Sequence, residues 1–181
     1  MQRLTQEALR KRLLQPSLWF APRQHLWLQC APSSTEAAAS ASSLWRVQWG
    51  LTAQGMDRLG DVTKVTSLID SHPSRRSVML QGQDLLHVHW EGYNWTEADE
   101  LYHTVWESVE GTENIAVPVT GEIVHIIDSS KTVVDEDVVW VEMKCREHDL
   151  IQAAVQWTND EALYERLIQT LAPSKFSDQT A

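Results

Sequence analysis

Three histidines have the residue type and spacing that a metal site would need. His87 and His89 are two residues apart in a strand-like stretch, so their side chains share one face of that strand. His103 follows further along the chain, and three imidazoles can hold a zinc ion. Alternation with the apolar neighbours of His87 and His89 explains the same spacing as the polar outer face of a sheet. We therefore interpret them as surface histidines and predict no metal site.

Serine and carboxylate side chains offer no catalytic arrangement in this sequence. Ser108 stands in a Glu-Ser-Val run rather than in the Gly-x-Ser-x-Gly turn of a serine hydrolase. A glycosidase needs two carboxylates at a defined separation in a cleft, whereas the acidic residues here are clustered in turn-like segments. These clusters are Glu97, Asp99 and Glu100, and Asp135, Glu136 and Asp137. With no phosphate loop or glycine fingerprint either, we predict that the chain is not an enzyme.

The composition narrows the class of protein further. Fifteen basic against 25 acidic residues give a formal net charge of −10, without the basic footprint of a nucleic-acid binder. No apolar run approaches the roughly 20 residues of a membrane span. Cys30 and Cys145 form neither a disulfide framework nor a zinc pattern, so we predict two reduced thiols. Nine tryptophans indicate either a large buried core or an apolar contact surface.

The predicted secondary structure consists mainly of short strands separated by turn signals. Thr52 is placed to cap a short helix near 53–59 that Gly60 ends, and a second helix is expected near 160–171. Residues 91–97 and 110–114 contain glycine and asparagine, which is typical of turns. The pattern predicts a mainly β sandwich or barrel with few peripheral helices. Strands are expected at 25–30, 44–51, 62–69, 78–80, 85–90, 101–109, 115–119, 121–127 and 133–145.

Several motifs, in one order along the chain, resemble the glycine cleavage H protein family. The family reads Val-Glu-Ser-Val-Lys and then Pro-Val-x-Gly-Glu-Val, and this chain reads Trp106-Glu107-Ser108-Val109-Glu110 and then Pro118-Val119-Thr120-Gly121-Glu122-Ile123, at the same interval. Upstream and downstream, His25-Leu26-Trp27-Leu28, Gly50-Leu51-Thr52, Leu59-Gly60-Asp61 and Val134-Asp135-Glu136-Asp137 are similar to further family motifs. The resemblance covers most of residues 25–171. It implies the barrel-sandwich hybrid of lipoyl and biotinyl domains, whose modified lysine lies at a hairpin tip.

The principal departure from the family falls on the lipoyl site itself. Glu110 occupies the position of the lipoyl lysine, flanked by Glu107, Ser108 and Val109. Lipoylation forms an amide and requires an amine, which a carboxylate does not have. No lysine stands between Lys64 and Lys131, so a shifted alignment supplies no substitute. The resemblance therefore implies a member of the family without lipoate and without a cofactor-binding residue.

Two segments lengthen the chain relative to the family pattern. Residues 31–43, rich in Ala and Ser, read as a loop, and residues 70–90 are inserted before the lipoyl-type strand. The second insertion is apolar, so it must pack on something, although the family core should not require it. Two interpretations stay open: contact with a protein partner, or packing on the chain's own barrel.

The N-terminus has the composition of a mitochondrial targeting segment. Basic residues outnumber acidic ones in the first 35 positions, with Arg3, Arg10, Lys11, Arg12 and Arg23 against Glu7 alone. Apolar residues recur at helical spacing between Leu4 and Leu18, as in an amphipathic transit peptide. A basic helix that belongs to the folded body is the alternative. We divide the chain into a targeting or N-terminal extension (1–23), an H-protein-like domain (24–172) and a tail (173–181).

These observations together favour an interaction protein over a carrier. We expect a non-lipoylated accessory or structural subunit of a larger assembly in the mitochondrial matrix or facing it, acting by protein–protein contact. The alternative is an aminomethyl carrier of the glycine cleavage system, or a regulator of that system or of lipoate transfer. The sequence predicts protein partners, no nucleic acid and no membrane span.

The first testable prediction concerns the modification. The native chain should show no mass increment of about 188 Da, the mass of lipoic acid less water, because Glu110 offers no amine for the amide bond. Intact-mass and peptide mass spectrometry of protein from its natural source provide the measurement. A lipoyl-lysine peptide anywhere in the chain would contradict the prediction.

Overall fold

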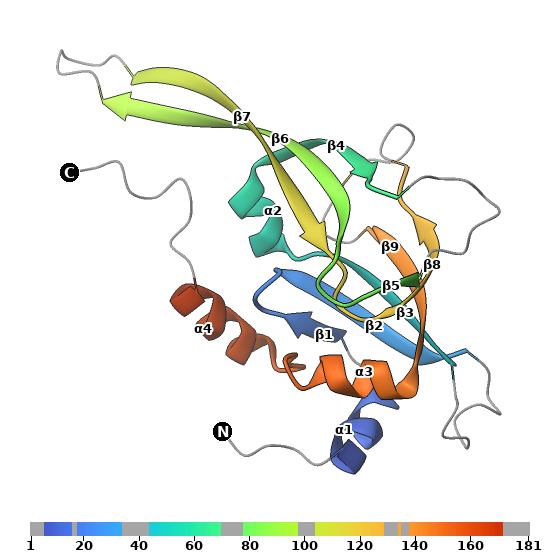
Figure 1. The fold of residues 1–181 in the computed structure, drawn as a ribbon. Coiled ribbons are helices and arrows are strands. Elements are labelled where there is room, and N and C mark those ends of the chain that lie inside the picture. Colours follow the sequence, from blue (N-terminus) through green and yellow to red (C-terminus); the bar gives the residue numbers. More distant parts are fainter. Residues whose placement is uncertain are drawn as a thin grey trace.

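A computed structural model describes two antiparallel sheets with four helices around them (Figure 1). The described residues are 6–15, 18–33, 44–69, 78–97, 104–128, 134 and 138–171. The six-stranded sheet has the order β1-β2-β3-β9-β8-β5, and the three-stranded sheet has the order β4-β6-β7. The strands of the two sheets are β1 (Leu18–Ala21), β2 (Leu26–Pro32), β3 (Leu44–Leu51), β4 (Asp61–Ser67), β5 (Val78–Met79), β6 (Asp84–Glu97), β7 (Thr104–Ala116), β8 (Gly121–Ile126) and β9 (Val141–Arg146). The fold is mainly β, as the sequence predicts, and both sheets are open among the described residues.

Local sequence explains where the predicted short helix begins and ends. Helix α2 (Ala53–Leu59) starts at Thr52, whose hydroxyl accepts a hydrogen bond from the Gly55 N–H at 3.1 Å. It ends at Gly60, whose φ of 89° suits glycine and whose N–H donates to the Met56 carbonyl. Helix α4 (Glu161–Leu171) also agrees with prediction. Helix α3 (Glu147–Ala154), directly after β9, was not predicted.

The N-terminal segment is built into the body of the protein. In helix α1 (Gln6–Leu13), Leu9 and Leu13 are buried, and Arg10 forms an ion pair with Glu147 of α3. Strand β1, which the sequence analysis did not predict, pairs with β2, and its Phe20 exchanges backbone hydrogen bonds with Thr158. The basic helix therefore packs as part of the folded chain, as in the alternative interpretation. Mitochondrial targeting stays a prediction.

The two segments expected to be turns are instead parts of long strands. Residues 91–97 continue β6, and residues 110–114 lie inside β7, with a continuous antiparallel register between the two strands. The turn prediction was wrong because Gly111 allows close packing here and does not form a turn. A Cβ on Gly111 would stand 2.3 Å from the indole of Trp90, so only glycine leaves room for that ring. Of the strand expected at 115–119, only residues 115 and 116 are in a strand, because β7 ends at Ala116.

The described part of the 70–90 insertion belongs to the core. Its strand β6 is the central strand of the three-stranded sheet and pairs with β4 on one side and β7 on the other. The expectation that the fold does not require this segment is therefore wrong, because β4 and β7 have no other bridge in the sheet. The insertion contributes these buried side chains: Met79, Leu85, Leu86, Val88 and Trp90. Residues 70–77 lie outside the described residues.

Most of the tryptophans also serve the core rather than a surface. All seven that have described side chains are buried: Trp19, Trp27, Trp45, Trp49, Trp90, Trp140 and Trp157. The indole N–H of Trp49 donates to the sulfur of Met143 at 3.3 Å, which joins β3 to β9 inside the core. Large aromatic side chains thus account for much of the apolar area that stabilises the two sheets.

Two leucines of the inserted segment test whether it belongs to the core. Leu86 is completely buried, whereas Leu80 is 57% exposed. Leu86→Ala should lower the free energy of unfolding by about 2–5 kcal/mol, because it leaves a cavity. Leu80→Ala removes the same atoms from a solvated position and should cost within about 0.5 kcal/mol. Denaturant unfolding provides the measurement, and equal losses in the two variants would contradict the assignment.

Candidate functional site

Glu110, which the resemblance aligns with a lipoyl lysine, lies within a strand, not at a hairpin tip. Glu110 is exposed in β7, more than five residues from the strand end at Thr104, and its backbone partner in β6 is Glu91. Ser108 beside it is exposed and Val109 is partly buried, while the side chain of Glu107 lies outside the described part of the chain. The expected tip position is therefore wrong, because the turn signals after Glu110 belong to a continuous strand. Its carboxylate offers no amine for acyl transfer.

The histidine pair is a surface feature of the three-stranded sheet. The rings of His87 and His89 meet edge to face with centroids 4.8 Å apart. The Nδ1 of His87 is 2.7 Å from the side-chain oxygen of Asn114, and the Asn114 amide donates to Asp84 at 3.1 Å. No group of three metal-ligating side chains occurs in the described part of the chain, and His103 lies outside it. Hydrogen bonding across the polar sheet face thus explains the pair.

The two cysteines are free and are shielded from solvent by neighbouring strands. Burial raises the pKa of Cys30 to about 12, and it also raises the pKa of Cys145. Since the thiolate is the reactive form, neither group is a good nucleophile at neutral pH. The acidic residues Asp99 and Glu100, like Asp135, Glu136 and Asp137, lie outside the described residues. The backbone of Glu97 lies at the end of β6.

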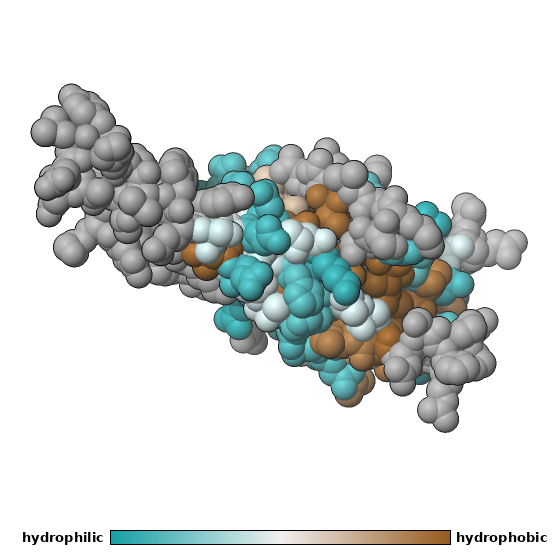
Figure 2. All heavy atoms as spheres, turned by 90° about the horizontal axis from the view of Figure 1, so that it is seen from above, coloured by the Kyte–Doolittle hydropathy of each residue, from teal (hydrophilic) through white to brown (hydrophobic). Residues whose placement is uncertain are grey.

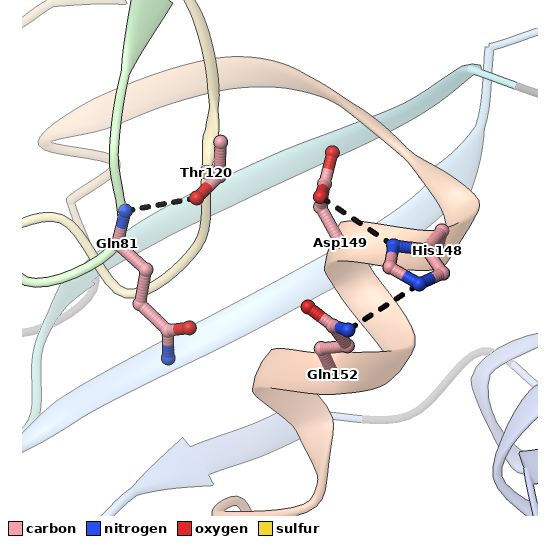
Figure 3. Close-up of polar contacts among 5 residues, drawn as sticks. All are labelled: Gln81, Thr120, His148, Asp149 and Gln152. Carbon is pink, nitrogen blue, oxygen red and sulfur yellow. Dashed lines mark hydrogen bonds and ion pairs between the residues drawn. The ribbon is translucent and has the colours of Figure 1, made fainter.

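A polar cluster on helix α3 has the residue types of a catalytic site without its surroundings. His148 contacts Asp149 at 3.7 Å through Nδ1 and Gln152 at 3.3 Å through Nε2 (Figure 3). All three side chains come from one helix, and His148 and Gln152 are exposed. Figure 3 also shows the Gln81 N–H donating to the Thr120 hydroxyl, which anchors the turn before β6.

A small pocket between α2, β7 and the β1–β2 turn is the best candidate site. Its volume is about 150 Å³, and its charged or titratable lining residues are Arg23, His25, Arg58 and Glu113. Apolar side chains of both layers complete the wall, among them Leu51, Leu59 and Ile115. The pocket therefore combines a few polar groups with an apolar wall, as small-molecule sites do.

The backbone at His25, which lines the pocket, is held in an unusual conformation. Its φ is 54°, in the left-handed region that side-chain-bearing residues seldom adopt. Its carbonyl accepts hydrogen bonds from the Thr52 N–H at 2.9 Å and from the Thr52 hydroxyl at 3.1 Å. A Cβ on Gly55 would stand 2.9 Å from the same carbonyl, so glycine is needed there. Thr52 and Gly55 together overdetermine the strained turn.

Two residues that line the pocket each have a buried polar atom without a hydrogen-bond partner among the described residues. His25 is only 8% exposed, and its Nδ1 has no hydrogen-bond partner among the described residues. The buried Nε of Arg58 likewise has none in that part of the chain. Burial lowers the pKa of His25, and the charge of Arg58 lowers it further, so the imidazole is neutral at pH 7. Arg58 also contacts Glu113 through Nη2 at 3.5 Å. Unpaired buried donors are unusual in native proteins and call for an explanation.

Little of this pocket is visible in the sequence. In the sequence, His25 is only the start of a family-like motif, and Thr52 is predicted only as a helix cap, which the structure confirms. Arg58 and Glu113 come from segments 55 residues apart, and no spacing rule joins them. The sequence offers one local signal, the Thr52 cap of helix α2, whose hydroxyl also holds the turn at His25.

Comparisons with models of known protein families, with curated proteins and with solved structures found no match to this chain. Among the described residues, no helix has the length and apolarity needed to cross a membrane.

A substitution at Glu110 tests its place in the sheet. Because Glu110 faces Glu91 across the strand pair, two like charges oppose each other, which is destabilising. Glu110→Lys should raise the free energy of unfolding by about 0.2–1 kcal/mol, and Glu110→Gln should raise it by less. Denaturant unfolding at low and high salt provides the measurement, since screening should shrink the gain. A loss of stability in Glu110→Lys would show that the side chain is paired or buried.

Proposed function

We propose that this chain is a non-lipoylated relative of the glycine cleavage H protein that acts by protein–protein contact, as an accessory subunit of a larger mitochondrial assembly. The ordered family-like motifs support the relationship, and with it a fold derived from the barrel-sandwich hybrid. The carboxylate of Glu110, in place of an acceptor amine, argues against a carrier role.

The observation that carries the proposal is an arm made of the outer halves of β6 and β7. The last residue of β6 that pairs with β4 is Glu91, yet β6 continues to Glu97 and β7 begins at Thr104. The strands beyond Glu91 thus form a two-stranded arm that projects from the body (Figure 1). Six residue pairs at about 3.3 Å each give it a length of roughly 20 Å. Two-stranded hairpins are marginal in water, so contact with another protein would stabilise this one.

The exposed edge of β7 also supports binding to a protein partner. β7 is an edge strand of its sheet, so within the described residues its outer backbone groups have no neighbouring strand. Such an edge is a template for pairing with another chain. Exposed apolar side chains are also present on the body, among them Val78 and Leu80, and Figure 2 shows apolar surface gathered on part of the face seen from above.

The charge of the chain favours a basic partner surface. The formal net charge is −10, and Glu91 and Glu110 are exposed at the base of the arm. Complementary charge speeds association and selects partners more than it adds affinity. A basic or neutral protein surface that accepts a strand is therefore the expected partner.

Excision of the arm tests the proposal. Joining Gly92 to Val109 through a two-residue Asn-Gly turn removes the arm while keeping every β4–β6 pair. The variant should keep its melting temperature and lose stoichiometric co-purification with its assembly from mitochondrial extracts. Glu165→Ala, an exposed change on α4, serves as the control that keeps its partners. The proposal is wrong if the folded arm-less variant recovers the same partners in the same amounts, or if the full chain has none.

A further inference from the structure

Two histidine rings of β6 lie next to each other on the outer face of the three-stranded sheet. His87 and His89 alternate with the buried Leu86 and Val88, so both rings point away from the core. Their centroids are 4.8 Å apart and their planes are nearly perpendicular, at 87°. Both residues are partly exposed. The pair therefore presents two imidazole rings, which are common metal ligands, on the surface of the sheet.

A chain of hydrogen bonds from Asp84 sets the tautomer of His87. An ionised carboxylate can only accept, so the Asn114 amide nitrogen, 3.1 Å from Asp84, must be the donor. The Asn114 side-chain oxygen then faces Nδ1 of His87 at 2.7 Å, and this oxygen can only accept. Nδ1 therefore carries the proton of the neutral ring, which leaves the lone pair of Nε2 available to a metal. Metal-ligating histidines usually have such an acceptor on their other nitrogen.

The ring of His89 is not fixed in this way, and its distance from His87 suits a shared ion. Among the described residues the His89 ring forms no hydrogen bond, and χ2 of histidine has broad wells, so the ring can turn toward its neighbour. An ion about 2.0 Å from one nitrogen of each ring, at a bond angle of about 90–109°, holds the ring centres roughly 4.5–5.2 Å apart. The observed 4.8 Å lies within this range. A chelate therefore needs a turn of one ring and no movement of the strand.

We propose that His87 and His89 chelate one divalent transition-metal ion, with Cu²⁺ preferred, and that water fills its other positions. Imidazole is a good ligand for copper, nickel and zinc, and the affinity of nitrogen sites is highest for Cu²⁺. No three side chains of the described residues form a metal site, so this is a site of two protein ligands. The alternation that predicts no metal site in the sequence does not reveal the tautomer of His87, so the proposal replaces that prediction. The site lies before the arm that begins beyond Glu91 and does not depend on the proposed function.

The charged groups around the pair favour a cation. Lys64 of β4 stands opposite His89 and is the positive charge among the neighbouring positions of the sheet. Asp84 is linked to the pair through its hydrogen bond, and Glu91 follows His89 on the same face of β6. Glu110 of β7 stands opposite Glu91. Three carboxylates against one ammonium leave a net negative charge, which attracts a divalent ion.

The experiment titrates the full-length protein, without a histidine tag, with copper(II) chloride in a buffer that does not coordinate metals. One equivalent of Cu²⁺ per chain should bind saturably, with two nitrogen ligands in its electron paramagnetic resonance spectrum. Ni²⁺ should bind more weakly, and an excess of Mg²⁺, which prefers oxygen ligands, should not compete. In the metal-free protein, nitrogen NMR should show the His87 proton on Nδ1, as its hydrogen bond to Asn114 requires.

Matched variants separate the chelate from copper binding by any surface histidine. His89→Gln removes one of the two ligands and should weaken Cu²⁺ binding about tenfold or more, because the second bond is intramolecular. His148→Gln makes the same change at an exposed histidine of α3 and should leave the affinity unchanged. Asn114→Val removes the acceptor that fixes His87 and should weaken binding about tenfold. Thr112→Val, on the same face of β7 opposite His89, is its control.

Three results would overturn the proposal. The first is the absence of saturable Cu²⁺ binding at one equivalent in the unaltered protein. The second is an equal affinity for Cu²⁺ in folded His89→Gln and His148→Gln, with folding checked by thermal unfolding. The third is a metal-free His87 that carries its proton on Nε2, since that tautomer has no lone pair facing outward for the ion.

Discussion

The hydroxyl of Thr52 joins three parts of the fold that carry the candidate site. A threonine hydroxyl has one proton and two acceptor positions, and all three are used. It donates to the His25 carbonyl at 3.1 Å, accepts from the Gly55 N–H at 3.1 Å, and lies 2.6 Å from the hydroxyl of Tyr164, which must then donate. The side chain is 4% exposed, so these bonds form away from competing water. The Thr52 hydroxyl therefore forms hydrogen bonds with three elements: the β1–β2 turn, helix α2 and helix α4.

The elements joined at Thr52 make further contacts with β1 near the N-terminus and with β7. Tyr164 stacks on Phe20 with ring centroids 4.9 Å apart, and Phe20 pairs with Thr158, so α4 closes over β1. On the other side, α2 carries Arg58 toward β7, where it meets Glu113. The pocket lies where these layers meet, and its strained His25 stays in place because the layers around it are fixed. This arrangement explains how a turn residue with a φ of 54° persists in the native state.

Local signals in the sequence predicted the elements that depend on neighbouring residues. Strand β3 and helix α2 follow from alternation and from the Thr52 cap, and both have the expected bounds. The long strands β6 and β7 could not be predicted in this way, because Gly111 leaves room for Trp90, which lies directly opposite it in β6 but far from it in the sequence. The pocket was equally hidden, since Arg58 and Glu113 become neighbours only when helix α2 packs beside the three-stranded sheet. Predicting either feature requires the tertiary contacts themselves.

The central claim is that the Thr52 hydroxyl couples the C-terminal helix to the turn that forms the pocket. A double-mutant cycle of Thr52→Val and Tyr164→Phe, measured by denaturant unfolding, tests it most directly. Each single change leaves buried polar groups unpaired, and the double change removes both ends of the Thr52–Tyr164 bond. The account predicts a coupling free energy of about 0.5–3 kcal/mol, with the His25 ring resonances shifted in both single variants. Additive losses with unchanged His25 resonances would contradict it.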